Sequence, residues 1–425
     1  MSTLSDPPVE RFQLSQLIND TRYRSYTFQF IALILLVLFF AYLGSNLVNN
    51  LREAGLNISF GFLSEPAGYD INQRLLDYNS QDSHLRASFL GLINTLIIAV
   101  LGCFTATIIG VTVGVLRLSN NWLVAKIMAI YVEIFRNVPV LIWILIIMAI
   151  FTASLPHMRS FHGDDPENTF ALFNTLAVTK QGVWFSEPMF SRSLGEISLF
   201  GSHSLRFDVS LDFVAIIAVL MASFFGARAW TKHANKVQQE TGVRPNTSLV
   251  NLAIWFVPLI ALLIILGFYL DGPTLTGRKL KPIDDGIYLR NSLIALWFAL
   301  SIYTAAFIAE NVRAGILAIS KGQTEAAASL GLRPGRIMNL VILPQALRVI
   351  IPPLISQYLN LTKNSSLAIA VGYMDITGTL GGITLNQTGR AIECVLMLML
   401  FYLTISLSIS AIMNAYNNAV KLKER

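Results

Sequence analysis

The chain has 425 residues, of which 54% are hydrophobic and only 13% are charged, and its formal net charge is +6. A soluble protein carries about 25% charged residues, so this composition excludes an ordinary soluble enzyme and places the chain in a membrane. The basic residues are dispersed between apolar runs, so the positive charge indicates membrane topology rather than a nucleic-acid partner. Cys103 and Cys394 both lie inside apolar runs, where we interpret them as small core residues and not as a disulfide framework.

Apolar runs long enough to cross a bilayer recur along the chain, since a spanning helix needs about 20 such residues. The first follows a polar and basic tail, and it lacks the cleavage pattern of a signal peptide. The second contains Gly110 and Gly114, a small-residue pair that lets helices pack closely. Pro352 and Pro353 are expected to bend the seventh. The predicted spans are 28–46, 89–116, 122–151, 213–225 with an extension toward 230, 249–270, 292–309, 343–361 and 394–413.

Polar segments between these spans are interpreted as loops, the longest being 48–88 and 154–211. Eight spans put both ends of the chain on one side of the membrane, and the loops and tails on that side are rich in Lys and Arg. Such loops are typically cytoplasmic. The residues concerned are Arg11, Arg22, Arg24, Arg228, Lys232, Lys236, Arg244, Arg313, Lys321, Arg333, Arg336, Lys421, Lys423 and Arg425. The opposite loop 271–290 also holds basic residues, balanced in part by aspartates, and it weakens this signal without reversing it.

The segment 320–344 is less apolar than its surroundings. Ser320 and Gln323 have the spacing of a capping box, so a helix can begin there, and the alanines that follow are good helix formers. Gly331 stands where a left-handed C-terminal cap belongs, and Pro334 follows where the helix cannot continue. The pattern predicts a capped helix of about three turns. Its small, smooth surface suits docking into the groove of a partner.

Four residues of this segment resemble part of the EAA signature of ABC-transporter permease subunits. They are Glu325, Ala326, Ala327 and Gly331. Leu343 and Pro344 complete the resemblance at the expected spacing, and Val341 stands where that family usually has isoleucine. The resemblance implies that a partner ATPase binds these four residues on the cytoplasmic side. The alternative is a capped surface helix that packs only locally.

Four further blocks resemble permeases of the polar amino-acid branch of ABC importers, most of all the broad-specificity L-amino-acid and the glutamate/glutamine/aspartate/asparagine types. The blocks are 91–96, 131–139, 307–315, and 344–348 with 352–353 followed by 361–367. The resemblance implies a transport core of five spans, namely the second, third, sixth, seventh and eighth. The expected fold is therefore all-α, a polytopic membrane protein with about eight transmembrane helices, a five-helix permease core and a cytoplasmic coupling helix.

The same resemblance predicts how the chain is divided. Residues 1–88 hold the tail, the first span and a periplasmic loop, and residues 89–151 form the first part of the core. Residues 152–289 are an insertion with a long periplasmic loop and two extra spans. Residues 290–425 form the second part of the core and contain the coupling helix at 320–331.

The resemblance also implies an assembly in the cell inner membrane, with both termini of this chain in the cytoplasm. An ABC ATPase dimer binds and hydrolyses ATP, so this chain has no catalysis and no cofactor of its own. The dimer offers two grooves, which implies a second, homologous permease subunit. A periplasmic binding protein delivers the amino-acid substrate, and the loop 154–211 is a plausible additional contact for it.

Polar residues interrupt the third span at Glu133, Arg136 and Asn137, and Pro139 follows them. An ionisable group inside a span costs about 2.5–3.5 kcal/mol, so it usually faces a partner or a water-lined cavity. Glu133 and Arg136 are three residues apart on one helix face and close enough to pair. One interpretation is a broken helix that lines the substrate path. The other is an ion pair that fixes helix packing near the membrane interface.

A second polar run follows the seventh span, and its members are Lys363, Asn364, Ser365 and Ser366. Irregular polar backbone at membrane depth needs protein or water around it. This run is a candidate source of donors for the carboxylate of an amino acid, with Glu133 or a backbone carbonyl accepting from the ammonium. The alternative is a loop just outside the bilayer.

Glu310 and Arg313 lie where the sixth span leaves the membrane, three residues apart. At that spacing the two can form a surface pair worth a few tenths of a kcal/mol. We interpret the pair either as orienting the docking segment or as simply solvated.

No nucleotide or metal site is predicted. The segment 272–279 has two glycines at P-loop spacing but lacks the following Lys-Ser/Thr, and the five histidines have no metal-ligand spacing. The competing function is an ion-coupled secondary amino-acid transporter. It predicts an internal repeat with paired broken helices, and it leaves the Glu-Ala-Ala run unexplained.

Overall fold

The structure is a computed structural model that describes residues 18, 21–53, 55, 58–161, 169–199, 207–243, 245–275, 283–284 and 286–420. The chain divides into two compact units, residues 1–60 and residues 61–425. The described part contains eight helices long and apolar enough to cross a membrane, so the predicted number of spans is confirmed. Several predictions fall outside the described residues: the basic residues Arg11, Arg244, Lys421, Lys423 and Arg425, the side chain of Arg22, and the second half of segment 272–279.

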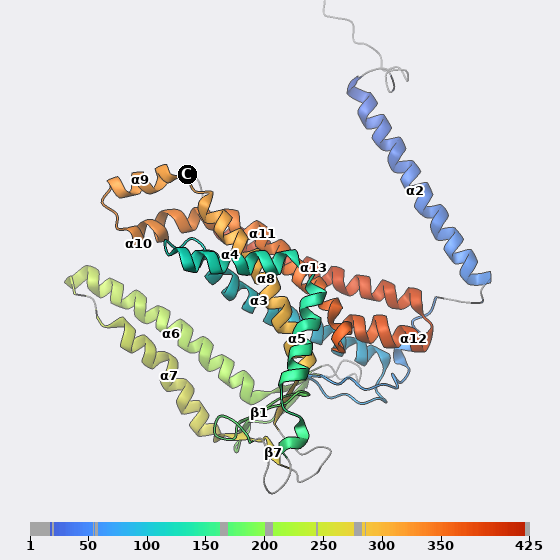
Figure 1. Ribbon diagram of the computed structural model, residues 1–425, viewed down its shortest axis with the longest axis horizontal. Coiled ribbons are helices and arrows are strands. Elements are labelled where there is room, and N and C mark those ends of the chain that lie inside the picture. Colours follow the sequence, from blue (N-terminus) through green and yellow to red (C-terminus); the bar gives the residue numbers. More distant parts are fainter. Residues whose placement is uncertain are drawn as a thin grey trace, which may run out of the picture. The chain divides into compact units, whose positions relative to one another are not determined.

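The first unit contains one long helix, α2 (Thr21–Glu53) (Figure 1). None of the residues in its most apolar 18-residue window is buried by other parts of the protein. An apolar helix that is exposed all round is stable in lipid or against a partner and not in water. The first predicted span is therefore confirmed, and the helix extends beyond it at both ends.

The second unit is organised around α3 (His84–Leu116) and α8 (Asn291–Leu317), which share the most extensive helix packing. Gly110 and Gly114 allow this close approach. A Cβ atom at Gly110 would lie 2.6 Å from the Cβ of Ile308, and one at Gly114 would lie 2.8 Å from the carbonyl oxygen of Ala309. The small-residue pair therefore brings two backbones together, as its spacing predicts.

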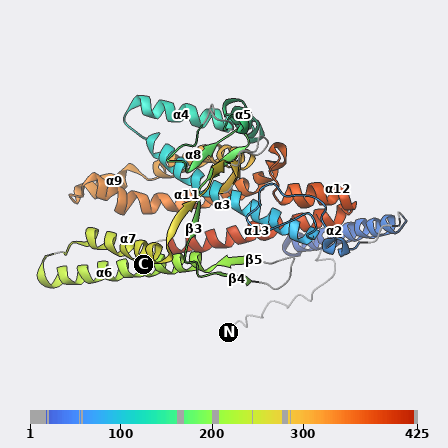
Figure 2. The ribbon, with the colours of Figure 1, turned by 90° about the horizontal axis from the view of Figure 1, so that it is seen from below.

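Three further helices complete the core around α3 and α8. They are α5 (Val140–Ser154), α11 (Leu343–Asn364) and α13 (Ala391–Val420). Helix α8 packs against α5 and α11, and α11 packs against α13 and α3. These five helices are the five core spans predicted from the sequence, and Figure 2 shows them crossing in one body.

The third predicted span, 122–151, is in fact two helices. Helix α4 (Trp122–Asn137) ends before Val138, which is extended with φ −109° and ψ 133°, and α5 begins after Pro139. Proline disfavours the helical conformation in the residue before it, and this accounts for the break. The candidate span begins only at Val140. Glu133, Arg136 and Asn137 therefore lie on α4, before the break, and not on the candidate span α5.

The seventh span is a continuous helical segment from Pro334 to Val371 with changes of helix type. It consists of α10 (Pro334–Ile337), the π-helix η3 (Met338–Ile342), α11 and the 3₁₀-helix η4 (Ser365–Val371). Pro352 and Pro353 lie inside α11. A second π-helix, η5 (Thr377–Thr384), and the short α12 (Leu385–Thr388) lead on to α13. A 3₁₀-helix, η1 (Gly61–Ser64), precedes α3.

Between α5 and α8 the chain forms an antiparallel helical hairpin. Its helices are α6 (Leu211–Thr241) and α7 (Thr247–Leu266), which run side by side in both views (Figures 1 and 2). Gly242 and Gly267 end the two helices in the left-handed conformation. Helix α6 is much longer than its predicted apolar span, because its last four turns are polar. Helix α7 stops at Leu266, where a strand replaces the predicted helical end.

The predicted loops 154–211 and 271–290 contain short strands, so the all-α expectation holds for the membrane helices but not for this insertion. After the 3₁₀-helix η2 (Met158–Phe161), an antiparallel sheet has the order β1-β2-β9, with β1 (Leu176–Val178), β2 (Gly182–Phe185) and β9 (Ile287–Arg290). Three two-stranded pairs join β3 (Glu187–Phe190) to β6 (Phe268–Asp271), β4 (Glu196–Leu199) to β5 (Phe207–Ser210), and β7 (Thr274–Leu275) to β8 (Ile283–Asp284). Strands of two to four residues leave little periodic signal in a sequence.

Candidate functional site

The segment that carries the Glu-Ala-Ala run forms α9 (Lys321–Ser329), and Ser320 is its N-cap, as predicted. The Ser320 side chain makes no capping hydrogen bond, so the capping-box geometry itself is not formed. At the other end Gly331 has φ +76°. Its N–H donates to the Ala328 carbonyl at 2.9 Å, and the Leu332 N–H donates to the Ala327 carbonyl at 3.4 Å. This is the Schellman arrangement, so the predicted glycine cap is confirmed.

Helix α9 exposes most of its surface. Glu325, Ala326 and Ala328 are exposed, while Ala327 faces inward and is buried. The side chain of Leu330 is 80% exposed directly after the helix. An alanine surface with a protruding leucine is small, smooth and apolar, which is the kind of surface that a partner groove covers.

The base of α9 is held by the segment that follows it. Helix α9 packs against α10 and η3, and Ile337 of α10 is buried beneath them. Since α8 leads directly into α9 and α11 follows η3, a displacement of α9 acts on two core helices at once. The segment therefore connects the exposed helix α9 to the core.

A charge cluster ties the same end of α8 to its neighbours. Glu310 of α8 forms ion pairs with Arg117, at the end of α3, and with Arg313, at 3.2 Å. Arg136 of α4 lies 3.8 Å from Glu310 and stacks over Phe307, with 5.4 Å between the guanidinium carbon and the ring centroid. One carboxylate thus holds three helices together at the end from which α9 leaves.

This cluster corrects one prediction and extends another. Arg136 pairs with Glu310 on another helix and not with Glu133, and Glu133 instead accepts a 3.4 Å hydrogen bond from Asn137. Spacing along one helix reveals i, i+3 neighbours, but it cannot reveal a partner on a packed helix. The predicted pair of Glu310 and Arg313 is formed. Arg117 was not singled out from the sequence, although it ends an otherwise apolar run.

The run 363–366 lies at the junction of α11 and η4, so its backbone is helical and not irregular as expected. Ser365 donates to the carbonyl of Thr362 and Ser366 to that of Lys363, both at 2.8 Å. The two hydroxyls are thus used within the helix. The side chains of Lys363 and Asn364 make no hydrogen bond or ion pair to any residue that the structure describes, so they remain available to a ligand.

The structure does not bring the two predicted polar groups together. Leu361, just before the run, packs against Gly102 in the middle of α3, whereas Arg136 meets the cluster at Arg117. Fifteen residues of helix separate Gly102 from Arg117, or about 22 Å at 1.5 Å per residue. Glu133 and the run 363–366 therefore lie at well-separated levels along α3.

A buried network of hydrogen bonds lies at the other end of α3, and the sequence did not predict it. Asn94 donates from Nδ2 to the carbonyls of Gln73 and Met374, both at 2.8 Å, and its main-chain carbonyl accepts from the hydroxyl of Tyr373 at 3.1 Å. Asp375 is fully buried and accepts from the N–H of Gly378 at 2.9 Å. These contacts hold the segment that leads into η5 against α3.

Burial raises the pKa of Asp375 to about 6, and hydrogen bonds to the carboxylate counteract the rise only in part. The hydroxyl of Tyr402 on α13 lies 3.3 Å from this carboxylate. A lone acid within an apolar stretch is a signal that could have drawn attention to Asp375 in the sequence.

Comparison with known proteins identifies the family of this chain. The family model for the "Binding-protein-dependent transport system inner membrane component" matches residues 247–422. The glutamate/glutamine/aspartate/asparagine transport system permease protein BztB of Rhodobacter capsulatus is 53% identical over 433 residues, covering 100% of both chains. The general L-amino acid transport system permease protein AapQ of Rhizobium johnstonii is 38% identical over 410 residues, covering 96% of this chain and 94% of its own.

Among solved structures, one described as an amino acid ABC transporter with histidines aligns with 78% of this chain and 94% of its own, at 17% identity and a TM-score of 0.42. The sequence relatives span the whole chain, including the hairpin and the strands of the insertion. On the strength of that full-length identity, the chain belongs to the family of membrane permease subunits of amino-acid ABC importers.

Proposed function

We propose that this chain carries L-amino acids across the cytoplasmic membrane as the permease of an importer whose separate ATPase supplies the energy. The observation that carries the proposal is α9, an exposed helix that ends in a glycine cap at Gly331 and is followed by the exposed Leu330. Nothing else in the described part of the chain covers this surface. An ATPase groove that takes the segment Glu325 to Gly331 would bury Glu325, Ala326 and Gly331, while Ala327 packs on the inner side of α9.

The charge cluster gives this docking a mechanical consequence. A movement of α9 reaches α8 directly and reaches α3 and α4 through Glu310, Arg117 and Arg136. An ATPase dimer that opens and closes would favour one arrangement of these helices in each state, because only differential contact between two states can shift their populations. The ATP would be bound entirely by the partner.

The proposed assembly contains two further proteins. A second, homologous permease would occupy the other groove of the ATPase dimer, and a periplasmic binding protein would deliver the substrate to the strand-rich insertion. The proposed location is the inner membrane, with both termini and α9 in the cytoplasm. The basic residues Arg228 and Lys232 in the second half of α6, and Arg313 and Lys321 at the passage from α8 to α9, support this orientation.

The proposed substrates are acidic amino acids and their amides, or a broad range of L-amino acids. The names of the two full-length relatives describe these two ranges. Lys363 and Asn364 are proposed to bind the substrate carboxylate, with Ser365 and Ser366 shaping the helix junction that presents them. Glu133, Arg136 and Asn137 are proposed to act on the conformation of the path through α4, at a distance from the ligand.

A site-directed cross-link tests the coupling proposal. A cysteine replaces the exposed Ala328 in a chain whose Cys103 and Cys394 are changed to alanine, and the membrane-embedded protein is treated with a bifunctional reagent. We expect capture of an ATPase, with a yield that changes when nucleotide is added. Transport that continues on an ion gradient, with no ATPase captured, would overturn the proposal in favour of a secondary transporter.

Substitutions at the helix junction test the ligand proposal. Lys363→Ala and Asn364→Ala should raise the substrate concentration needed for half-maximal uptake. Ser408→Ala on α13 is the matched control, because its hydroxyl donates to the carbonyl of Thr404 within the helix and lies outside the proposed site. Uptake with unchanged concentration dependence in the first two variants would remove these residues from the substrate path without affecting the docking of α9.

A further inference from the structure

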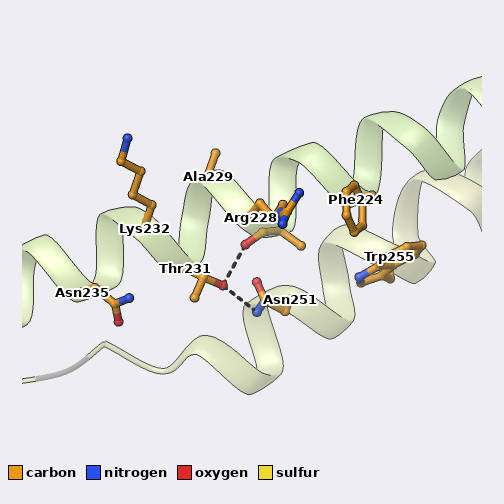
Figure 3. Close-up of a pocket in the computed structure, with 9 residues that line it drawn as sticks. Phe224, Arg228, Ala229, Thr231, Lys232, Asn235, Asn251 and Trp255 are labelled. Atoms are coloured by element: carbon orange, nitrogen blue, oxygen red, sulfur yellow. Dashed lines mark hydrogen bonds between the residues drawn. The ribbon is translucent and has the colours of Figure 1, made fainter. Parts of the chain in front are cut away.

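The hairpin of α6 and α7 encloses a groove that the transport function does not use. Its volume is about 690 Å³. Arg228 and Lys232 line one wall from α6, and Asn251 and Trp255 line the other from α7 (Figure 3). Both helices are membrane-crossing, and only 11% and 6% of their most apolar windows are buried within the protein. The hairpin therefore faces lipid or another subunit along most of its length.

Two cations without a counterion line the groove, and the side chain of Lys232 extends from α6 away from α7 (Figure 3). Arg228 and Lys232 stand four residues apart on α6, and neither forms an ion pair with a residue that the structure describes. The guanidinium of Arg228 lies over the ring of Phe224, 4.9 Å from its centroid. By contrast Lys236, one turn further on, has a partner in Glu240 at 3.8 Å. The excess positive charge is thus concentrated at the groove.

A buried acceptor lies beside these cations. Asn251 donates from Nδ2 to the hydroxyl oxygen of Thr231 at 3.2 Å, and Thr231 donates to the carbonyl of Ala227 at 2.8 Å (Figure 3). The Oδ1 atom of Asn251 is buried and has no hydrogen-bond partner among the described residues. A buried acceptor left without a donor is costly, so a hydroxyl in the groove would be favourable there.

The surroundings suit acyl chains. Toward the membrane centre the hairpin surface continues with exposed apolar side chains, including Met221, Phe225 and Phe256. Trp255 stands where the apolar and charged parts meet, a position that tryptophan favours at membrane–water interfaces. Two cations, a hydroxyl acceptor and an adjoining apolar surface match the phosphate, the glycerol hydroxyls and the acyl chains of one molecule.

We propose that this groove binds the headgroup of an anionic phospholipid of the phosphatidylglycerol type. Arg228 and Lys232 hold the phosphate, and Asn251 accepts a hydrogen bond from the terminal glycerol. Basic pockets between membrane helices bind anionic headgroups by this chemistry. In the orientation proposed above, the lipid belongs to the cytoplasmic leaflet. The bound lipid holds the α6–α7 hairpin in place within the membrane, whether or not an ATPase is docked.

The test uses the full chain in nanodiscs of phosphatidylcholine with or without phosphatidylglycerol, followed by release and native mass spectrometry of the retained lipid. We expect the wild-type chain to retain phosphatidylglycerol in preference to phosphatidylcholine. The double variant R228Q/K232Q should retain it about 30-fold less, at about five-fold for each cation. Lys236→Gln, the matched control one turn away, should keep the preference. Equal retention of both lipids, or an equal loss in Lys236→Gln, would overturn the proposal.

Two further arms keep the result interpretable. Asn251→Leu should reduce the preference for phosphatidylglycerol over phosphatidic acid, which lacks the terminal glycerol, while both anionic lipids are still retained over phosphatidylcholine. If R228Q/K232Q does not fold, this variant tests the proposal by itself, and an unchanged preference for phosphatidylglycerol over phosphatidic acid would overturn it. Soluble glycerol phosphate should not displace the lipid, and displacement would reassign the groove to a soluble anion.

Discussion

The helix pair α3–α8 and the helix pair α6–α7 cross the membrane in the same chain but are built on different principles. In α8, 67% of the most apolar window is buried within the protein, against 6% in α7. The core pair is joined by close glycine contacts and by Glu310, which holds two helices to α8. The hairpin leaves two cations without a counterion and one buried amide oxygen without a donor among the described residues. The core helices are thus packed mainly against other parts of the same chain. The hairpin helices instead expose most of their surface to lipid or to another subunit.

The largest effect is expected from Glu310→Gln. The carboxylate and its partner Arg117 are mostly buried, with side-chain exposures of 27% and 14%. Removing one partner of a buried ion pair costs about 3–5 kcal/mol, because the other charge stays buried. We expect a fall in thermal stability and a loss of uptake per ATP hydrolysed. Glu240→Gln on the hairpin should change neither, and similar losses in both variants would contradict the contrast.

A smaller effect, with a pH signature, is expected from Asp375→Asn. The pKa of Asp375 is about 6 in the folded chain, against 3.8 for an exposed carboxyl. The native state therefore binds this proton more tightly, so stability is greatest at low pH and falls as the pH rises through 6. At neutral pH the raised pKa of Asp375 lowers the free energy of unfolding by roughly 3 kcal/mol relative to its value at low pH.

Thermal unfolding at pH 5 and pH 7 measures this effect. The wild-type chain should lose stability between the two values, and Asp375→Asn should lose much less. An unchanged pH dependence in the variant would show that another group is responsible.

Glycine substitutions should act in opposite directions in the two pairs. Gly110→Ala forces a Cβ to within 2.6 Å of the Ile308 Cβ and 2.9 Å of a backbone oxygen, and overpacking of this kind costs about 1–3 kcal/mol. Gly226→Ala on α6 meets only a side-chain methyl of Ile254 at 3.3 Å. There the higher helix propensity of alanine should give a slight gain. Unfolding temperatures of the two variants check the sign.

The smallest effect is expected for the exposed pair of Lys236 and Glu240, whose side chains are 74% and 61% exposed. Pairs of this kind contribute about 0.3–0.5 kcal/mol. The double variant Lys236→Gln/Glu240→Gln should unfold within a degree or two of the wild-type chain. A larger shift would mean that the outer surface of the hairpin is covered by a partner.

Much of this architecture was predictable because it depends on neighbours in the sequence. Eight apolar runs, the N-cap at Ser320 and the glycine cap at Gly331 all follow from local composition and backbone conformation. The Glu-Ala-Ala run and its spacing to Leu343 and Pro344 indicated the family for the same reason. The pair of Gly110 and Gly114 indicated close packing but not the helix it would contact.

The partners of polar groups were not predictable in this way. Arg136 has a possible partner in Glu133, three residues away, but it pairs with Glu310 on another helix. The strands of the insertion pair across about a hundred residues, as β2 does with β9. Burial decides the pKa of Asp375, and the packing of α3, η5 and α13 produces that burial.

The sequence by itself determined the membrane spans, the capped coupling helix and the family, since hydrophobicity, helix caps and motif spacing act over a few residues. Only the tertiary structure decided which charges pair, which acid is buried and where a groove with unpaired cations opens. Those properties depend on distances between residues far apart in the chain, and desolvation and ion-pair energies are set by those distances.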